Sequence, residues 1–376
     1  MTVITRQFTK DILSSTLFAL TALVALFAFF DLVGQLDSVG NGRTLGDVFL
    51  LTGLAIPGRV YQVMPLAALL ASIYTMSRWA ASSEFTVLRV AGLSPLKLCA
   101  SVSVSAVIIL STTYLFGEFL APPAEKYAVE VKTLAKAANL TARGYSSGLW
   151  LRDMGNQEQP LNRYINVSYI RADNNRETGP WRVFEFDQSG HLRRMLNSQS
   201  ASYVNDQGWI LHNVNISEYP VIPRGEEEQK ELSVTRRTEQ SLVFGSTLGP
   251  EMLSVFTSRP DDMSIRDLSR FINHLNANSQ DTEKYEISFW TKIFYPLSTL
   301  VMLMLSLPFA YMNARSGGMA IKMFAGIMIG ITFYALSNIF AYLGTTTMLS
   351  PMLAALLPTL GMLIVGGFAL AMVERR

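Results

Sequence analysis

The sequence is poor in the side chains that build disulfides and metal sites. It holds one cysteine, Cys99, and three histidines, His191, His212 and His274, which lie far apart along the chain. A lone cysteine cannot form an internal disulfide, and the histidines lack the short spacings that are typical of zinc sites. We therefore predict no bound metal and a fold held together by packing alone.

Motifs for catalysis and for nucleotide binding are also missing. The chain contains neither G-x-x-x-x-G-K-[ST] nor G-x-S-x-G, so it offers no P-loop for ATP and no context for a serine hydrolase. A net charge of +2 is too small to argue for a nucleic-acid partner. We expect no catalytic residue, no cofactor bound by this chain, and a protein that is not itself an enzyme.

Charge is scarce and unevenly distributed. Only 16% of the 376 residues are charged, whereas 49% are hydrophobic, which is too apolar for an ordinary soluble protein. A helix needs about 20 apolar residues to cross a bilayer, so the almost uncharged runs predict six membrane spans, two of them in the last run. The runs are 12–30, 48–77, 98–117, 293–314 and 323–373.

The basic residues of the short loops indicate an orientation. If the spans alternate, one side receives nearly all of them, and the opposite short loops hold only Arg43. The positive-inside rule then predicts cytoplasmic N- and C-termini, with the large insertion between the third and fourth spans on the far side. The basic residues on the cytoplasmic side are Arg6, Lys10, Arg78, Arg89, Lys97, Arg315, Lys322, Arg375 and Arg376.

The insertion has the pattern of a β domain. Segments such as "RYINVSYI", "WRVFEFD" and "GWILHNVNISEYP" alternate with the two-residue period of half-buried strands, and the segments between them are rich in Gly, Asn and Asp. This favours an antiparallel sheet, either a sandwich or an open roll. The predicted layout is a membrane half over 1–120, a β domain with flanking helices over 121–286, the second of them capped by Ser264, and a second membrane half over 287–376.

A short charged helix is predicted between the second and third spans, over 82–92. Ser82 or Ser83 can cap its start, Glu84 falls in its first turn, and Gly92 supplies its end. Phe85 and Leu88 share one face with Gly92 at helical spacing, so the helix presents an apolar face to a partner or to a lipid surface.

Two alternative functions rest on other features of the sequence. Asp31, Arg59 and Glu118 are charged residues within or beside the spans, which could indicate an ion-coupled secondary transporter. Asp31 and Glu118 fall near the outer ends of their spans, however, so an interfacial position is the favoured interpretation. A membrane-anchored scaffold for proteins on the far side is the other alternative, but it leaves the charged helix unexplained.

Three stretches resemble a known family. The segments "SEFTVLRVAGLS" at 83–94, "GEFLAPPAEKYA" at 117–128 and "WTKIFYPLSTLVMLMLSLPF" at 290–309 are similar to the lipopolysaccharide-export permeases of the LptF/LptG family, and to its LptG subunits in particular. The resemblance implies six spans with an inserted periplasmic β-jellyroll, in the inner membrane of a Gram-negative bacterium. It also implies a heterodimer with LptF, an LptB ATPase dimer that holds ATP and Mg, the LptC subunit, and transfer of lipopolysaccharide to the periplasmic bridge protein LptA.

The resemblance assigns roles to two sets of residues. The helix at 82–92 would dock on the ATPase through a coupling set: Ser83, Glu84, Phe85, Leu88, Arg89 and Gly92. Aromatic and basic residues would meet the lipid, although an ordinary β-core role is the favoured interpretation for each aromatic strand residue. The set is Phe27, Phe30, Arg59, Lys132, Trp150, Phe184 and Trp209. The lysines expected at the outer end of the first span are absent, because Asp31, Asp37 and Ser38 occupy that stretch, and this weakens headgroup binding there.

Overall fold

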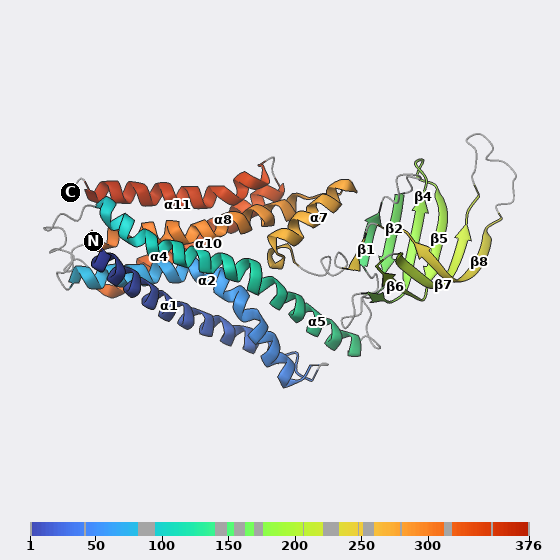
Figure 1. Ribbon diagram of the computed structural model, residues 1–376, viewed down its shortest axis with the longest axis horizontal. Helices are drawn as coiled ribbons and strands as arrows, with labels where there is room; N and C mark the ends of the chain where they lie inside the picture. Colours follow the sequence, from blue (N-terminus) through green and yellow to red (C-terminus); the bar gives the residue numbers. More distant parts are fainter. Residues whose placement is uncertain are drawn as a thin grey trace. The chain divides into compact units, whose positions relative to one another are not determined.

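The computed structural model shows a chain made of two compact units (Figure 1). The helical unit comprises Met1–Ala128, Pro260–Ile272 and Asp281–Arg376, and the β unit comprises Val129–Arg259 and Asn273–Gln280. Two of the divisions, at 128/129 and 272/273, fall inside helices that flank the β strands, whereas the sequence composition changes at 120/121 and 286/287. The structure describes residues 2–40, 43–81, 95–139, 149–153, 162–168, 176–205, 207–220, 233–246, 248–250, 259–278, 280–311, 318–346 and 349–374.

Six long apolar helices are found among the described residues of the helical unit, which confirms the six predicted spans. Both chain termini lie at one end of this unit, which we call the terminal end, and the loop between the first two helices lies at the opposite or far end (Figure 1). The helices are α1 Thr2–Leu36, α2 Leu45–Ala81, α4 Pro95–Leu115, α8 Glu283–Ser306, α10 Met319–Thr346 and α11 Pro351–Glu374.

Shorter elements connect or follow the long helices. A π-helical turn, η1, spans Phe116–Leu120 and joins α4 to α5, which spans Ala121–Asn139. A 3-10 turn, η2 (Pro260–Asp262), precedes α7 (Ile265–Ala277), and α9 (Pro308–Tyr311) follows α8. The predicted cap of α7 is confirmed, because the Ser264 hydroxyl accepts a hydrogen bond from the backbone N–H of Asp267 at 3.1 Å.

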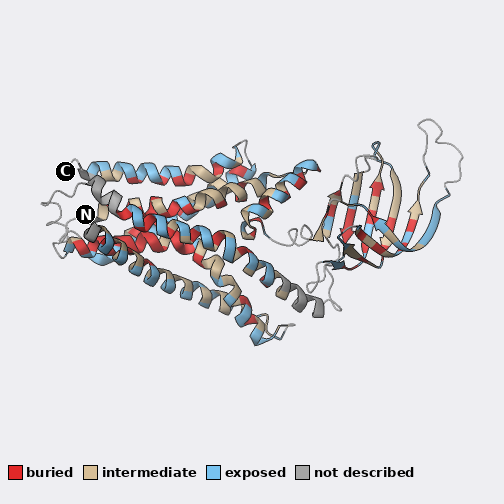
Figure 2. Cartoon of the chain, viewed as in Figure 1, coloured by how far each residue is buried: buried red, intermediate tan, exposed pale blue. Residues whose placement is uncertain are grey.

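Close helix packing holds the helical unit together. Gly330 of α10 faces α2 so closely that an added Cβ would lie 2.3 Å from Cδ1 of Leu66. Figure 2 shows the buried faces turned toward neighbouring helices and much of the outer surface exposed. Because that exposed surface is largely apolar, with Phe18 of α1 78% accessible, it is suited to lipid or to partner helices rather than to water.

The β unit contains one curled antiparallel sheet, which matches the open roll rather than the sandwich. Its strand order is β1-β2-β4-β5-β7-β6-β3, and β8 pairs with β7. Asn213, at φ 50°, bends β7 so that β6 pairs with its first half and β5 with its second. The strands are β1 Leu149–Asp153, β2 Asn162–Val167, β3 Glu177–Thr178, β4 Trp181–Phe186, β5 Leu192–Ser198, β6 Ser200–Val204, β7 Gly208–Glu218 and β8 Thr235–Phe244.

One face of the sheet carries the core of the β unit. Trp181 and Trp209 are fully buried there, with ring centroids 5.0 Å apart, and Phe244 of β8 packs against Trp181. Alternation along the strands places every second residue on this face, as the sequence pattern predicted.

Candidate lipid-handling sites

The coupling set lies outside the described residues. Ser83, Glu84, Phe85, Leu88, Arg89 and Gly92 all fall within 82–94, between the end of α2 and the start of α4. Their docking on an ATPase therefore stays a prediction.

Two ion pairs connect α1 to α2. At the terminal end, Nη2 of Arg78 lies 2.6 Å from Oδ2 of Asp11, and farther along the hairpin Arg59 pairs with Asp31. Asp11 and Asp31 are 20 residues apart in sequence, which at 1.5 Å per helical residue is about 30 Å, the thickness of a bilayer's hydrocarbon core. The two pairs thus bracket a segment of the length that crosses hydrocarbon.

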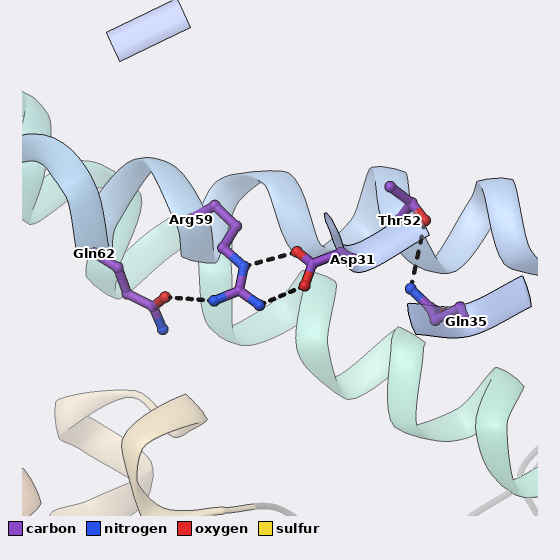
Figure 3. Close-up of polar contacts among 5 residues, drawn as sticks. All are labelled: Asp31, Gln35, Thr52, Arg59 and Gln62. Atoms are coloured by element: carbon purple, nitrogen blue, oxygen red, sulfur yellow. Dashed lines mark hydrogen bonds and ion pairs between the residues drawn. The ribbon is translucent and has the colours of Figure 1, made fainter. Parts of the chain in front are cut away.

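The Asp31–Arg59 pair has the geometry of a strong, partly buried ion pair (Figure 3). Arg59 donates from Nε to Oδ2 of Asp31 at 2.7 Å and from Nη2 to Oδ1 at 2.6 Å, so the contact is bidentate. Its third nitrogen, Nη1, donates to Oε1 of Gln62 at 2.9 Å, and the guanidinium lies 5.7 Å from the centroid of the Phe27 ring. Asp31 therefore neutralises the charge of the arginine that the sequence proposed for lipid binding.

The other candidates on the helices differ in accessibility. Phe30 is 60% exposed on α1, so it is available to an acyl chain, and Phe27 is 37% exposed beside Arg59. Lys132 of α5 is half-buried and interacts with a neighbouring residue. A lipid phosphate at Arg59 would have to compete with the carboxylate of Asp31.

The structure separates the three aromatic candidates of the β unit. Trp150 of β1 and Phe184 of β4 lie on the face opposite the core, where their rings stack with centroids 5.9 Å apart, and Trp150 is 52% exposed. Trp209 lies on the core face, fully buried, and its indole N–H donates to the carbonyl of Leu248 at 2.6 Å. In this structure Trp209 is a core residue, because alternation turns it away from Trp150 and Phe184, and contact of any of the three with lipid stays a prediction.

Sequence reasoning missed Lys292, which is a buried cation of the helical unit. Lys292 lies in α8 and is 7% exposed; its Nζ donates to the backbone carbonyl of Gly117 at 3.2 Å and lies 6.0 Å from the centroid of the Tyr61 ring. It precedes the uncharged run 293–314 by one residue, so the hydropathy pattern treats it as a boundary. Its place directly beside a predicted span was the signal that could have found it.

An ion pair ties the start of α7 to α5. Nζ of Lys126 lies 2.7 Å from Oδ2 of Asp267. Partial burial raises the pKa of the Asp267 carboxyl, but hydrogen bonds from Lys126 and Ser264 outweigh it, and the net shift of the pKa is downward. The carboxyl of Asp267 is therefore ionised at neutral pH. Among the described residues, no group of three or more His, Cys, Asp or Glu side chains could hold a metal ion.

These features define a class of protein: a six-span helical membrane protein with a β unit inserted between its third and fourth spans. A family described as "Lipopolysaccharide export system permease LptF/LptG" matches residues 6–372, and the chain belongs to this family. The chain is 28% identical over 357 residues to the lipopolysaccharide export system permease protein LptG of Haemophilus influenzae, covering 94% of each chain. It is 28% identical over 360 residues to the LptG protein of Escherichia coli K12, covering 95% of this chain and 94% of that one.

Proposed function

We propose that this chain is the LptG-type permease subunit of an ATP-driven exporter that extracts lipopolysaccharide from the outer leaflet of the inner membrane. The observation that carries the proposal is the family match over nearly the full length, on a chain whose β unit interrupts two sets of three spans. The chain would not catalyse a reaction itself. ATP and Mg would be held by a partner ATPase.

The architecture suits the physical problem of moving a multi-acyl lipid. Exposing an acyl chain to water costs about 0.8 kcal/mol per CH₂, hence on the order of 10 kcal/mol for a chain of about a dozen carbons. Every stage of transfer must therefore cover the chains. The exposed apolar surface of α1, which includes Phe30, offers such cover within the membrane, and the exposed Trp150 with its neighbour Phe184 offers an aromatic surface in the β unit.

The proposed assembly follows from the family. A second permease, LptF, would pair with this chain, an LptB dimer would supply the energy, and LptC with the bridge protein LptA would receive the lipid. Both termini would be cytoplasmic and the β unit periplasmic, in agreement with the basic residues at the terminal end, such as Arg6 and Arg78. The helix at 82–92 would then lie on the cytoplasmic side, where it could dock on the ATPase through Glu84 and the apolar face at Phe85 and Leu88.

An ion-coupled carrier is the weaker alternative. Such a carrier needs an intramembrane carboxylate that can load and release an ion. Both oxygens of Asp31 already accept hydrogen bonds from Arg59, so this carboxylate is held by a fixed internal cation. A scaffold without transport activity is the other alternative, and the purification and reconstitution described next distinguish it from an exporter.

The test is to purify the protein with its native partner subunits, identify the subunits and bound lipid by mass spectrometry, and reconstitute the complex in liposomes. We expect a co-purifying ATPase, bound lipopolysaccharide, and lipid release that requires ATP. Truncating one partner of a desolvated charge pair costs about 2–5 kcal/mol, so Glu84→Ala should release the ATPase or uncouple hydrolysis from lipid release.

Val90→Ala is the control, because in the predicted helix Val90 lies at neither three- nor four-residue spacing from Glu84, Phe85 or Leu88 and so falls on the opposite face. A Glu84→Ala complex that retains its ATPase and releases lipid at the unaltered rate would remove the coupling assignment. Lipid movement without nucleotide would favour the carrier, and a complex with neither ATPase nor lipid would favour the scaffold.

A further inference from the structure

The buried Lys292 belongs to a contact network at the far end of the helical unit that the proposed function leaves without a role. Lys292 donates a hydrogen bond to the backbone carbonyl of Gly117, the second residue of the π-helical turn η1. A charged side chain at this depth is costly and needs compensating partners. Here the partners are a backbone carbonyl and the face of Tyr61.

Gly117 is also contacted by the ring of Tyr61 from α2. An added Cβ on Gly117 would lie 2.4 Å from Cε2 of Tyr61, so the ring occupies the space that any larger residue would need. In η1 the N–H of Ala121 donates to the carbonyl of Phe116, a bond across five residues. Tyr61 and Lys292 therefore fix the π-helical turn at one residue, from α2 and from α8.

The π-helical turn also connects the two segments that lead to the β unit. The carboxylate of Glu118 in η1 accepts a hydrogen bond from the backbone N–H of Ile265, the first residue of α7, at 2.9 Å. The Lys126–Asp267 ion pair joins α5 to α7 two turns farther along α5. α5 and α7 are thus linked to each other and to η1 before either continues into the β unit.

On its other side, the network reaches the Asp31–Arg59 pair. Gln62, which follows Tyr61 in α2, accepts a hydrogen bond from Arg59 through its side chain and one from the Tyr295 hydroxyl of α8 through its backbone carbonyl, at 2.5 Å. Two consecutive residues of α2 therefore contact the ion pair, α8 and η1. A shift of α2 against α8 would reach the π-helical turn directly.

A π-helical turn differs from an α-helix by one extra residue in one turn. If η1 relaxes to α-helical bonding, the helix that follows it rotates by about 100° and moves by about 1.5 Å along its axis. Such a change in η1 would reorient α5 and strain the bonds at Ile265 and Asp267. Gly117 permits the tight packing in one form, and Lys292 supplies the donor that stabilises it.

We propose that Lys292 is a positioning residue of a π-helical joint, formed with Tyr61, Gly117 and Glu118, through which movement of α2 and α8 is passed to α5 and α7 during lipid transfer. The joint changes between a π-helical form, in which Lys292 binds the Gly117 carbonyl, and an α-helical form, in which that bond is released. This proposal rests on the proposed export function, but its structural part can be tested separately.

The experiment compares Lys292→Met, Lys292→Arg and Lys284→Met in the intact complex in liposomes. Lys284 is the matched control, since it is an exposed lysine in the same helix. Coupling between sites corresponds to about 5–150-fold effects, so Lys292→Met should lower the lipid released per ATP hydrolysed by at least about fivefold. Lys292→Arg should retain release, because its guanidinium can still donate to the carbonyl, and Lys284→Met should match the unaltered complex.

A distance measurement reports on the joint itself. Spin labels at Tyr127→Cys in α5 and Glu283→Cys in α8, in a Cys99→Ser background, should show a distance change when ATP is added. Lys292→Met should abolish that change. A structural role alone would lower complex yield or thermal stability, whereas the joint predicts normal yield with a lost nucleotide response.

Each of these experiments has an outcome that would refute the π-helical joint. Lys292→Met with unaltered release per ATP and an unaltered distance change would refute it. If Lys292→Met does not assemble, Glu118→Ala removes the bond to Ile265 and leaves Lys292 in place, and an unaltered distance change in that variant would also refute it. If the unaltered complex releases no lipopolysaccharide, the proposed function fails, and the distance change alone decides the joint.

Discussion

The two units place their apolar side chains in opposite ways. The β unit turns Trp181 and Trp209 onto one face and buries them completely, as a water-exposed domain must. The helical unit leaves large residues such as Phe18 and Ile364 exposed on its outside and packs its inside through close helix contacts. Hydrophobic burial therefore stabilises the β unit, whereas precise fit between helices stabilises the helical unit.

The units also place their ion pairs differently. In the β unit, Glu185 is 1% exposed in the middle of the sheet and pairs across the strands with Arg163 at 2.9 Å and Arg194 at 2.6 Å. In the α1–α2 hairpin the two ion pairs instead stand at the ends of the apolar segment. A membrane span tolerates charge best near the headgroups, so depth in the bilayer, rather than the core, determines where its ion pairs lie.

The largest effect is expected when a buried tryptophan ring is removed from the core of the β unit. Trp209→Ala removes a fully buried indole and leaves the Leu248 carbonyl without its donor, so the free energy of unfolding of the β unit should fall by about 3–5 kcal/mol. Limited proteolysis and thermal unfolding of the purified protein measure the loss. The helical unit should keep its unfolding transition.

Trp150→Ala is the matched control for Trp209→Ala. Trp150 is half exposed and its main contact is the stack on Phe184, which is worth about 0.5–1.5 kcal/mol. If Trp150 contacts lipid, this variant should reduce lipid release at nearly unaltered stability. Equal destabilisation by the two substitutions would contradict the division of the sheet into a core face and an exposed face.

An effect of intermediate size is expected when a larger side chain is placed in the interface between α10 and α2. In Gly330→Val the new side chain meets Leu66, and overpacking of this kind costs about 1–3 kcal/mol. Thermal unfolding in detergent should show the loss. Gly53→Val is the control, because a Cβ at Gly53 meets no atom within 4 Å. The added substitution Leu66→Ala should restore part of the stability, and failure to do so would argue against this contact as the cause.

The smallest expected effect is a pH dependence in the β unit. Burial lowers the pKa of the His274 imidazole below its ordinary value of 6.5, although Asp153 opposes the shift. The folded state therefore binds the proton less readily than the unfolded state, so stability is complete above about pH 6.5 and falls as the pH drops below that value. Thermal unfolding between pH 8 and pH 5.5 measures this slope. His274→Gln should flatten the slope.

Much of the fold could be predicted from the sequence, because the deciding forces are local. Hydrocarbon solvates neither charge nor free backbone groups, so each uncharged run of sufficient length became a span. Strand alternation and the Ser264 cap are local in the same sense. The choice between a sandwich and an open roll depended on which strands pair, and that was not visible in any single segment.

The candidate sites were predicted less completely. Arg59 and Asp31 were both noticed, but their pairing joins residues 28 positions apart on different helices. Trp150, Phe184 and Trp209 were grouped by residue type, and only the strand register placed Trp209 on the opposite face from the other two. In each case the residue type identified a candidate, but the sequence did not show which residues that candidate contacts.

The sequence by itself determined the number of spans, the inserted β unit and the family, because each depends on composition or on short continuous segments. The tertiary structure alone decided the partners of buried polar groups. Lys292 shows the difference: in the sequence it is one cation beside an apolar run, and in the fold it binds a carbonyl 175 positions away, on a glycine that Tyr61 packs against. A buried charge is stabilised by the groups that surround it, and here those groups come from α2 and η1, which only folding brings next to α8.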